Sequence, residues 1–299
     1  YSDIDNYIKD LESRMLLHCS HEDILISKIF QFIINSGGKR IRPKILYCLY
    51  KIFCNKEEKL YSDQILNFGS AIEMIHTATL LHDDVIDEAK MRRGNKVVNA
   101  IWTNKEAILS GDYIFAKAFS IILAHGDICS ARMISNTAQD LVEGELLQMK
   151  NIRNYNISVN EYLKIVQLKT ASLFIATCKL GCIVSGSNYD EEKITILGSK
   201  IGTLFQLIDD VKDYFTKNHL TSKDLRSDFR EGKITLPIIL LMQNFSNANE
   251  VKELVGIFES ADRCNMRYFE LQTKFQAYKI RLQCIEYVQN MHNIIYKNY

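Results

Sequence analysis

Residues 80–89 read LLHDDVIDEA, and residues 205–214 read FQLIDDVKDY. Each segment ends an apolar run with two adjacent aspartates and a third aspartate three residues later. At about 100° per residue, the first and last aspartates of a cluster lie on one helical face, one turn apart. The clusters comprise Asp83, Asp84 and Asp87 in the first segment and Asp209, Asp210 and Asp213 in the second. Two apolar stripes that both end in carboxylates predict two helices pointing into one helical bundle with a polar mouth.

The chemistry of this mouth follows from its carboxylates. Like charges one turn apart destabilise a helix unless a cation lies between them. A single acidic cluster is usually a solvated helix end, but two copies on apolar stripes favour a functional site. Aspartate oxygens without His or Cys suit Mg²⁺, which completes its octahedron with water and phosphate. We therefore interpret the mouth as a site for a Mg²⁺-bound phosphate ester.

Composition supports a helical fold. The 299 residues include 37 Lys+Arg and 36 Asp+Glu, and 47% are hydrophobic, which excludes a disordered or collagen-like chain. The balanced charge argues against a nucleic-acid binder. Only 2 Pro and 13 Gly favour long helices over many short strands, so we expect one all-α domain over residues 1–299. Apolar spacing predicts helices over residues 4–18, 22–36, 42–54, 62–88, 104–124, 128–149, 160–185, 190–216 and 235–246, with a tail from 250 onward.

Cysteine usage and hydropathy bear on location. The 8 cysteines include no CxxC pair and are too sparse in 299 residues for a disulfide scaffold, which indicates reduced thiols in an intracellular compartment. Cys178 and Cys182 invite a zinc interpretation, but nothing nearby completes four ligands, so packed thiols are favoured. The most apolar stretch, 234–242, is far shorter than the ~20 residues of a crossing helix, so we expect no membrane span. The acidic start is not a targeting peptide, and a mitochondrial or other organellar location stays open if such a segment precedes it.

Basic residues that would meet a phosphate occur in four places. Two glycines precede the first group, where the backbone is able to approach an anion and guanidinium groups bind phosphate bidentately. A charged residue also interrupts the apolar segment 166–180, where it needs a partner inside the bundle. Taken singly, each place has an ordinary structural interpretation as a turn, a solvated pair or a surface lysine. The candidates are Lys39, Arg40 and Arg42, then Arg92 and Arg93, then Lys169 beside Thr170, and finally Lys223 and Lys233.

Six segments in a fixed order resemble the trans-isoprenyl diphosphate synthases. They are GGKRIRP at 37–43, LLHDDVIDEAKMRRG at 80–94, LVEGELLQMK at 141–150, LKTASL at 168–173, FQLIDDVKDY at 205–214 and DFREGKITLP at 228–237. Within that family the chain is most similar to the long-chain, octaprenyl or solanesyl type of polyprenyl diphosphate synthase. The resemblance implies an isoprenoid-synthase-type helical bundle around a deep apolar tunnel, with both acidic clusters at its mouth.

The resemblance also implies an activity. The chain would join an allylic prenyl diphosphate to isopentenyl diphosphate, head to tail, and form a long-chain all-trans polyprenyl diphosphate. About three Mg²⁺ ions would hold the allylic diphosphate and stabilise it as a leaving group. A homodimer is expected, and the product would serve as a membrane lipid precursor such as a ubiquinone side chain.

The site residues are carried over from the same resemblance. The catalytic set is Asp83, Asp84, Asp87, Asp209, Asp210 and Lys169, and the metal ligands are Asp83, Asp87, Asp209 and Asp213. Isopentenyl diphosphate would contact Lys39, Arg42, His76 and Arg93. The allylic diphosphate would contact Arg92, Lys169, Thr170, Gln206, Lys223 and Lys233. Ala78 and Thr79 would set product length. They are small one turn before Asp83, where short-chain relatives carry aromatic rings, so the groove would stay open and a floor would lie deeper, near Cys54, Met133 or Ile134.

Three alternatives remain open. A geranylgeranyl diphosphate synthase would share the chemistry and make a shorter product. A non-catalytic partner subunit is disfavoured, because neither an aspartate of the clusters nor Lys169 is missing. A class I terpene cyclase usually replaces the second aspartate cluster by an Asn/Ser/Glu set and has no second-substrate site.

Overall fold

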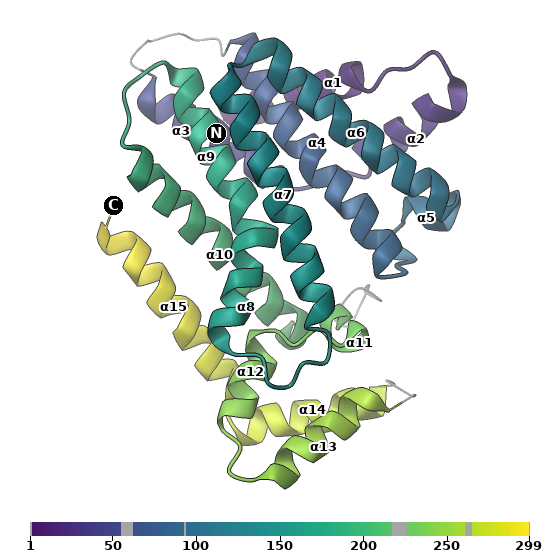
Figure 1. Ribbon diagram of the computed structural model, residues 1–299, viewed down its shortest axis with the longest axis vertical. Coiled ribbons are helices and arrows are strands. Elements are labelled where there is room, and N and C mark those ends of the chain that lie inside the picture. The colour runs from purple at the N-terminus through teal and green to yellow at the C-terminus, as the bar shows by residue number, and fades with distance from the viewer. Residues whose placement is uncertain (1, 55–61, 93, 217–225, 261–264, 299) are drawn as a thin grey trace. The chain divides into compact units, whose positions relative to one another are not determined.

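The chain folds into two helical units (Figure 1). The computed structural model describes residues 2–54, 62–92, 94–216, 226–260 and 265–298. Unit 1 consists of Tyr1–Gln139 and Leu173–Gly198, and unit 2 of Asp140–Ser172 and Ser199–Tyr299. Across the described ranges the only strands are two of two residues each, so the all-α prediction is confirmed. The prediction of a single domain stays a prediction.

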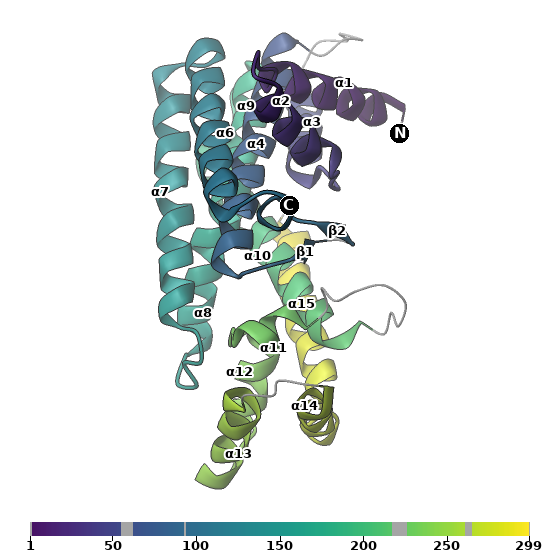
Figure 2. The ribbon, with the colours of Figure 1, turned by 90° about the vertical axis from the view of Figure 1, so that its right-hand side faces the viewer.

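Unit 1 contains most of the N-terminal helices. Its elements are α1 (Ser2–His18), α2 (Ile24–Asn35), α3 (Ile41–Phe53), α4 (Asp63–Ile86), β1 (Met91–Arg92), β2 (Asn95–Lys96), α5 (Val98–Ile101) and α6 (Asn104–His125). It also holds the first half of α7 (Ile128–Lys150) and nearly all of α9 (Ser172–Ser185). The strands β1 and β2 form a small antiparallel hairpin after α4 (Figure 2).

Helix α4 is the central helix of unit 1. It packs most extensively on α6 and also contacts α1 and α3. Its apolar side chains recur at helical spacing, and Phe68, Ile72 and Ile75 are almost completely buried. In the same unit, local capping defines the start of α2, because the Asp23 carboxylate accepts the backbone N–H groups of Leu25 and Ile26. The buried stripe of α4 leads directly to the acidic cluster at its C-terminal end.

Unit 2 begins inside α7 and holds the rest of the described chain. Its elements are α8 (Val159–Val166), the π-helical turn η1 (Gln167–Ala171), most of α10 (Glu191–Phe215), α11 (Ser227–Glu231), α12 (Leu236–Gln243), α13 (Ala248–Glu259), α14 (Asn265–Ala277) and α15 (Ile280–Asn298). Helix α8 starts at a capping box, in which Ser158 and Glu161 satisfy each other's backbone N–H groups.

The core of unit 2 is built around aromatic side chains. Phe229 packs edge-to-face on Phe258, with ring centroids 4.9 Å apart, and Leu236 and Leu271 are fully buried in the same cluster. Helices α13 and α14 pack against each other, and α15 contacts both α12 and α14 (Figure 1). This packing holds α11 and the segment that follows it in a fixed position within the unit.

Two stretches of helix meet the length and composition expected of a membrane span. They are Asn104–His125 and the continuous run Val159–Ser185, and in their most apolar 18-residue windows 33% and 61% of the residues are buried. The core helices of soluble proteins meet the same criterion. The predicted absence of a membrane span, like the predicted intracellular location, stays a prediction.

Candidate active site

The first acidic cluster forms the C-terminal turn of α4 in unit 1. Asp83 and Asp87 are half-buried, and Asp87 caps the helix by donating its backbone N–H to the Asp83 carbonyl at 2.8 Å. Asp84 turns inward and is only 5% exposed. It accepts a hydrogen bond from Arg92 Nε at 2.8 Å, and burial raises its pKa although this arginine opposes the shift. The outer pair therefore offers carboxylate oxygens, while the middle aspartate anchors the β1–β2 hairpin.

The second cluster lies near the end of α10 in unit 2 and follows the same pattern. Asp209 is exposed, and Asp210 is 5% exposed. Asp210 accepts hydrogen bonds from Tyr162 Oη at 2.5 Å and from Gln206 Nε2 at 2.6 Å. Burial raises the pKa of Asp210 to about 6, against the effect of these two donors.

Asp213 has a different surrounding. Its Oδ1 accepts the backbone N–H groups of Arg226 and Ser227 at 2.9 and 3.2 Å, and its Oδ2 accepts that of Asp228 at 3.2 Å. The Arg226 guanidinium also lies 4.1 Å above the Tyr268 ring. Asp213 therefore fixes the start of α11, which leads to the segment 228–237.

Lys169 lies in the π-helical turn η1 that joins α8 to α9. Such turns are rare and are frequent at functional sites. Its ammonium group forms an ion pair with Glu145 of α7. Gly144 permits this approach, because a Cβ atom there would lie 2.5 Å from the backbone nitrogen of Lys169. The glycine of the segment 141–150 is thus required by close packing of α7 on the turn that carries the lysine.

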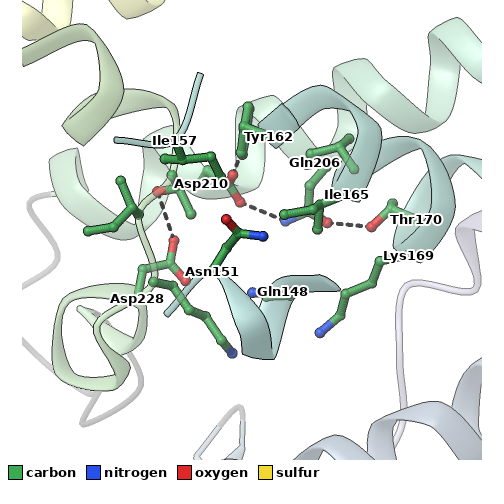
Figure 3. A pocket seen from close by; sticks show the side chains of 14 residues that line it. Gln148, Asn151, Ile157, Tyr162, Ile165, Lys169, Thr170, Gln206, Asp210 and Asp228 are labelled. Carbon is green, nitrogen blue, oxygen red and sulfur yellow. Dashed lines mark hydrogen bonds between the residues drawn. The ribbon is translucent and has the colours of Figure 1, made fainter. Parts of the chain in front are cut away.

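A cavity of about 130 Å³, lined by both polar and apolar side chains, lies within unit 2 (Figure 3). The Thr170 hydroxyl donates to Gln206 Oε1 at 2.8 Å, which connects η1 with α10. Lys233 is mostly buried and pairs with Glu231 at 2.6 Å. Burial raises the pKa of Asp228, another lining residue, well above its usual value, and the nearby Asp210 and Asp213 add to this effect. The side chains with polar groups at this cavity include Tyr162, Lys169, Thr170, Gln206, Asp210 and Lys233.

The basic residues that follow Gly37 and Gly38 differ in exposure: Lys39 lies at the surface of unit 1, and Arg40 and Arg42 are buried. Lys39 is exposed. Arg42 is 7% exposed in the first turn of α3, with its guanidinium 4.5 Å above the Phe174 ring. Burial lowers the pKa of Arg42 to about 10, although Glu73 opposes this shift. Arg40, which the sequence offered as a third phosphate ligand, instead forms ion pairs with Glu12 and Glu73 at 3.0 and 3.1 Å.

The predicted residues fall into two groups. Unit 2 brings together Lys169, Thr170, Gln206, Asp210 and Lys233 around one cavity. Unit 1 holds Lys39, Arg42, His76, Ala78, Thr79, Asp83, Asp84, Asp87 and Arg92, of which His76 and Thr79 are half-buried and Ala78 is fully buried on α4. Arg93 and Lys223 lie outside the described residues. The convergence of the two acidic clusters at one mouth stays a prediction.

The sequence alone did not identify Tyr162, which lines the cavity, or Glu145, which pairs with Lys169. Tyr162 lies two turns before Thr170, and this spacing on one helical face was the available signal. Glu145 lies in the segment LVEGELLQMK, where Glu143 is also acidic, so the sequence carried no signal that singled out Glu145 as the partner of Lys169.

The donor set suits Mg²⁺. Within the described ranges no three His, Cys, Asp or Glu side chains are grouped as a preformed metal site. Even so, Asp83, Asp87 and Asp209 present carboxylates that are at least partly accessible, and hard oxygen donors of this kind bind Mg²⁺ through one or two ligands at a time. The residues present therefore fit the ion that the acidic clusters imply.

Comparison with known proteins identifies the family. The polyprenyl synthetase family model matches residues 23–270. The chain is 36% identical to octaprenyl diphosphate synthase of Escherichia coli (strain K12) over 221 residues, and this alignment covers 74% of this chain and 67% of that protein. It is 36% identical over 234 residues to nonaprenyl diphosphate synthase of Mycobacterium tuberculosis, covering 78% and 68%. The fold matches the crystal structure of a decaprenyl diphosphate synthase from Rhodobacter capsulatus with a TM-score of 0.88 and 27% identity, covering 98% of this chain and 89% of that one.

The chain therefore belongs to the polyprenyl synthetase family. The resemblance drawn from the six segments, the isoprenoid-synthase helical fold and the prediction of a prenyltransferase are confirmed. The relatives named as octaprenyl and nonaprenyl diphosphate synthases support the long-chain prediction.

Proposed function

We propose that the chain joins an allylic prenyl diphosphate to isopentenyl diphosphate, head to tail, and forms a long-chain all-trans polyprenyl diphosphate. The observation that carries this proposal is the cavity of unit 2, which is lined by two lysines and by the hydrogen-bonded side chains of Thr170, Gln206 and Asp210. A metal-bound diphosphate requires cations that bind its phosphates and carboxylates that bind the metal.

Metal binding would use the accessible aspartates. Asp83 and Asp87 would hold Mg²⁺ in unit 1 and Asp209 in unit 2, with about three ions in total by analogy with the family. When bound, Mg²⁺ neutralises the diphosphate and improves it as a leaving group. Asp213 is proposed as a further Mg²⁺ ligand. Three backbone N–H groups already donate to its oxygens, and because a carboxylate has about four acceptor positions, one position is left for the ion.

The allylic diphosphate would be held by cations that already have carboxylate partners. Lys169 pairs with Glu145 and Lys233 with Glu231, so the substrate phosphates would compete with these glutamates. Arg92 contacts Asp84 through Nε, and a guanidinium has four further N–H groups for phosphate. Lys223, outside the described residues, completes the proposed set.

The chemistry starts when the allylic C–O bond breaks and its electron pair leaves with pyrophosphate. The oxygen atoms of Thr170 and Gln206 would stabilise the resulting allylic cation through their dipoles. The double bond of isopentenyl diphosphate then attacks the cationic carbon and forms the new C–C bond. Loss of a proton to the departed pyrophosphate restores a double bond and completes one five-carbon extension.

Isopentenyl diphosphate would be held in unit 1. Lys39 is exposed and available for a phosphate, and His76 is half-buried on the face of α4 that leads to Asp83. Arg42 is fixed over Phe174, and its Nε has no hydrogen-bond partner among the described residues. Arg93 is proposed as the fourth contact.

The assembly is proposed to be a homodimer. One side of α6 exposes large apolar side chains within an arc of about 140°, calculated at 100° per residue. Tyr113 and Leu123 are 37% and 64% exposed on this side, and Ile108 and Leu109 are 42% and 66% exposed. A second copy would cover this surface, so Leu109→Glu is expected to shift the protein toward monomer in analytical ultracentrifugation. An unchanged sedimentation profile would contradict the dimer surface.

The deciding experiment is incubation of the pure protein with an allylic diphosphate, isopentenyl diphosphate and Mg²⁺, followed by sizing of the products. We expect products longer than geranylgeranyl diphosphate, which would supply a lipid precursor such as a ubiquinone side chain. Excess EDTA should abolish turnover, and Asp83→Ala should lower kcat at least ~10³-fold, because stabilisation of leaving-group charge contributes several kcal/mol.

Each alternative predicts a different outcome. A product that stops at four isoprene units, counted against standards, would identify a geranylgeranyl diphosphate synthase. No product from the chain alone, with activity restored by a second subunit, would indicate a partner role. Release of a cyclic hydrocarbon without consumption of isopentenyl diphosphate would indicate a cyclase.

A further inference from the structure

Three hydrogen bonds connect Tyr162 to Thr170 within unit 2 (Figure 3). Tyr162 Oη donates to Asp210 Oδ2 at 2.5 Å, and Gln206 Nε2 donates to Asp210 Oδ1 at 2.6 Å. The Thr170 hydroxyl then donates to Gln206 Oε1 at 2.8 Å. The members come from α8, α10 and η1, so the series ties three elements together at the cavity.

The direction of each bond determines the next one. Because Asp210 accepts from the Gln206 amide nitrogen, the amide oxygen of Gln206 is left to accept from Thr170. Asp210 has one donor on each oxygen, and the loss of either donor would allow its carboxylate to turn. Tyr162 is 4% exposed and Asp210 5%, so the hydroxyl and the carboxylate meet in a buried environment.

We propose that Tyr162 is a positioning residue: its hydroxyl holds Asp210 and, through Asp210 and Gln206, orients the Thr170 and Gln206 oxygens toward the site of the allylic cation. This inference rests on the proposed function. Tyr162 needs no contact with the reacting carbon, because its effect passes through the two residues that follow it in the series.

The expected effect is on the chemical step rather than on binding. Oriented dipoles stabilise charge that develops in the transition state, and a displacement of about 1 Å in such a site costs up to ~10²-fold in rate. Tyr162→Phe should therefore lower kcat by roughly 10- to 100-fold, for the reason just given. The KM for isopentenyl diphosphate should stay within about twofold, since that substrate is assigned to other residues.

A binding measurement separates orientation from general damage. An allylic thiodiphosphate, which resists ionisation, should bind Tyr162→Phe with unchanged affinity in calorimetry, because Lys169 and Lys233 are assigned to the diphosphate. The Tm of Tyr162→Phe, measured on the same preparation, reports whether the variant keeps its fold.

The chain offers a matched control for this variant. Tyr155 lies in the same unit, and its buried hydroxyl has no hydrogen-bond partner in the described part of the chain. Tyr155→Phe removes the same atom and should leave kcat unchanged. A second test uses an Asp210→Asn background, in which Tyr162→Phe should cause little further loss, since both changes interrupt the same series.

Five outcomes decide the inference. A selective fall in kcat with unchanged analogue binding, absent in Tyr155→Phe, supports it. A kcat for Tyr162→Phe within twofold of the wild type, or an equal loss in Tyr155→Phe, overturns it. Independent losses from Tyr162→Phe and Asp210→Asn overturn the route through Asp210. If the wild-type chain forms no product from the two diphosphates, the proposed function fails and this inference falls with it, a result that the wild-type assay alone reports.

Discussion

Removal of Glu73 should destabilise unit 1 substantially. The guanidinium of Arg40 donates to Glu73 at 3.1 Å, to Glu12 at 3.0 Å and to the Ile34 carbonyl at 2.9 Å. The side chains of Arg40 and Glu73 are each only 5% exposed, whereas that of Glu12 is 43% exposed. Glu73→Ala therefore leaves a buried cation whose remaining carboxylate is partly screened by water.

The magnitude follows from this burial. Removal of one partner of a buried ion pair typically costs 3–5 kcal/mol, and the surviving contact with Glu12 favours the lower end, about 3 kcal/mol. For a chain of 299 residues, an unfolding entropy of about 2.1 cal/mol/K per residue converts this loss into a fall in Tm of roughly 5 °C. Urea unfolding and calorimetry of the purified variant measure both quantities.

The same helix provides the control. Asp63, at the start of α4, pairs with Arg14 at 2.7 Å but is 81% exposed, so Asp63→Ala should cost at most about 1 kcal/mol. The double variant Arg40→Met with Glu73→Met should recover much of the loss, because apolar side chains often replace a buried pair at little cost. Equal destabilisation by Glu73→Ala and Asp63→Ala would refute the reasoning from burial.

Three further predictions concern the candidate site. Gly144→Ala should cost about 1–3 kcal/mol in unfolding free energy and reduce kcat, because its Cβ would lie 2.5 Å from the backbone nitrogen of Lys169; wild-type stability would contradict this. Arg42→Ala should raise the KM for isopentenyl diphosphate by one to two orders of magnitude, since a charge-assisted contact contributes roughly 1.5–3 kcal/mol, and equal weakening of both substrates would show the assignment to be wrong. Ala78→Phe or Thr79→Phe should shorten the product to farnesyl or geranylgeranyl length in a product-sizing assay, with the first condensation intact; an unchanged product distribution in both would place the floor elsewhere.

The long helices were predictable from the sequence. The predicted helix over 62–88 is observed as Asp63–Ile86, and that over 128–149 as Ile128–Lys150. Their apolar residues repeat at helical spacing over many turns, which is the strongest local signal a chain contains. The strands β1 and β2 and the helices α5 and α11 were missed, because elements of two to five residues are too short to show a period.

The π-helical turn was not predictable. The sequence indicated one helix over 160–185, and the structure places η1 between α8 and α9. The segment QLKTA contains no helix-breaking residue. A π turn depends on which carbonyl each N–H reaches, and the close approach of α7 at Gly144 is a tertiary contact that a linear pattern does not record.

Residue types and their spacing were determined by the sequence alone. Two aspartate clusters at helical spacing indicated oxygen ligands for a hard cation, and their order among six segments indicated the family. Only the tertiary structure decided the partners of the buried groups. Tyr162 meets Asp210 from 48 positions away, Lys169 meets Glu145 of another helix, and Arg42 lies over Phe174. A buried polar group must find a partner in three dimensions, and helix packing, rather than distance along the chain, determines which side chain lies within hydrogen-bond reach.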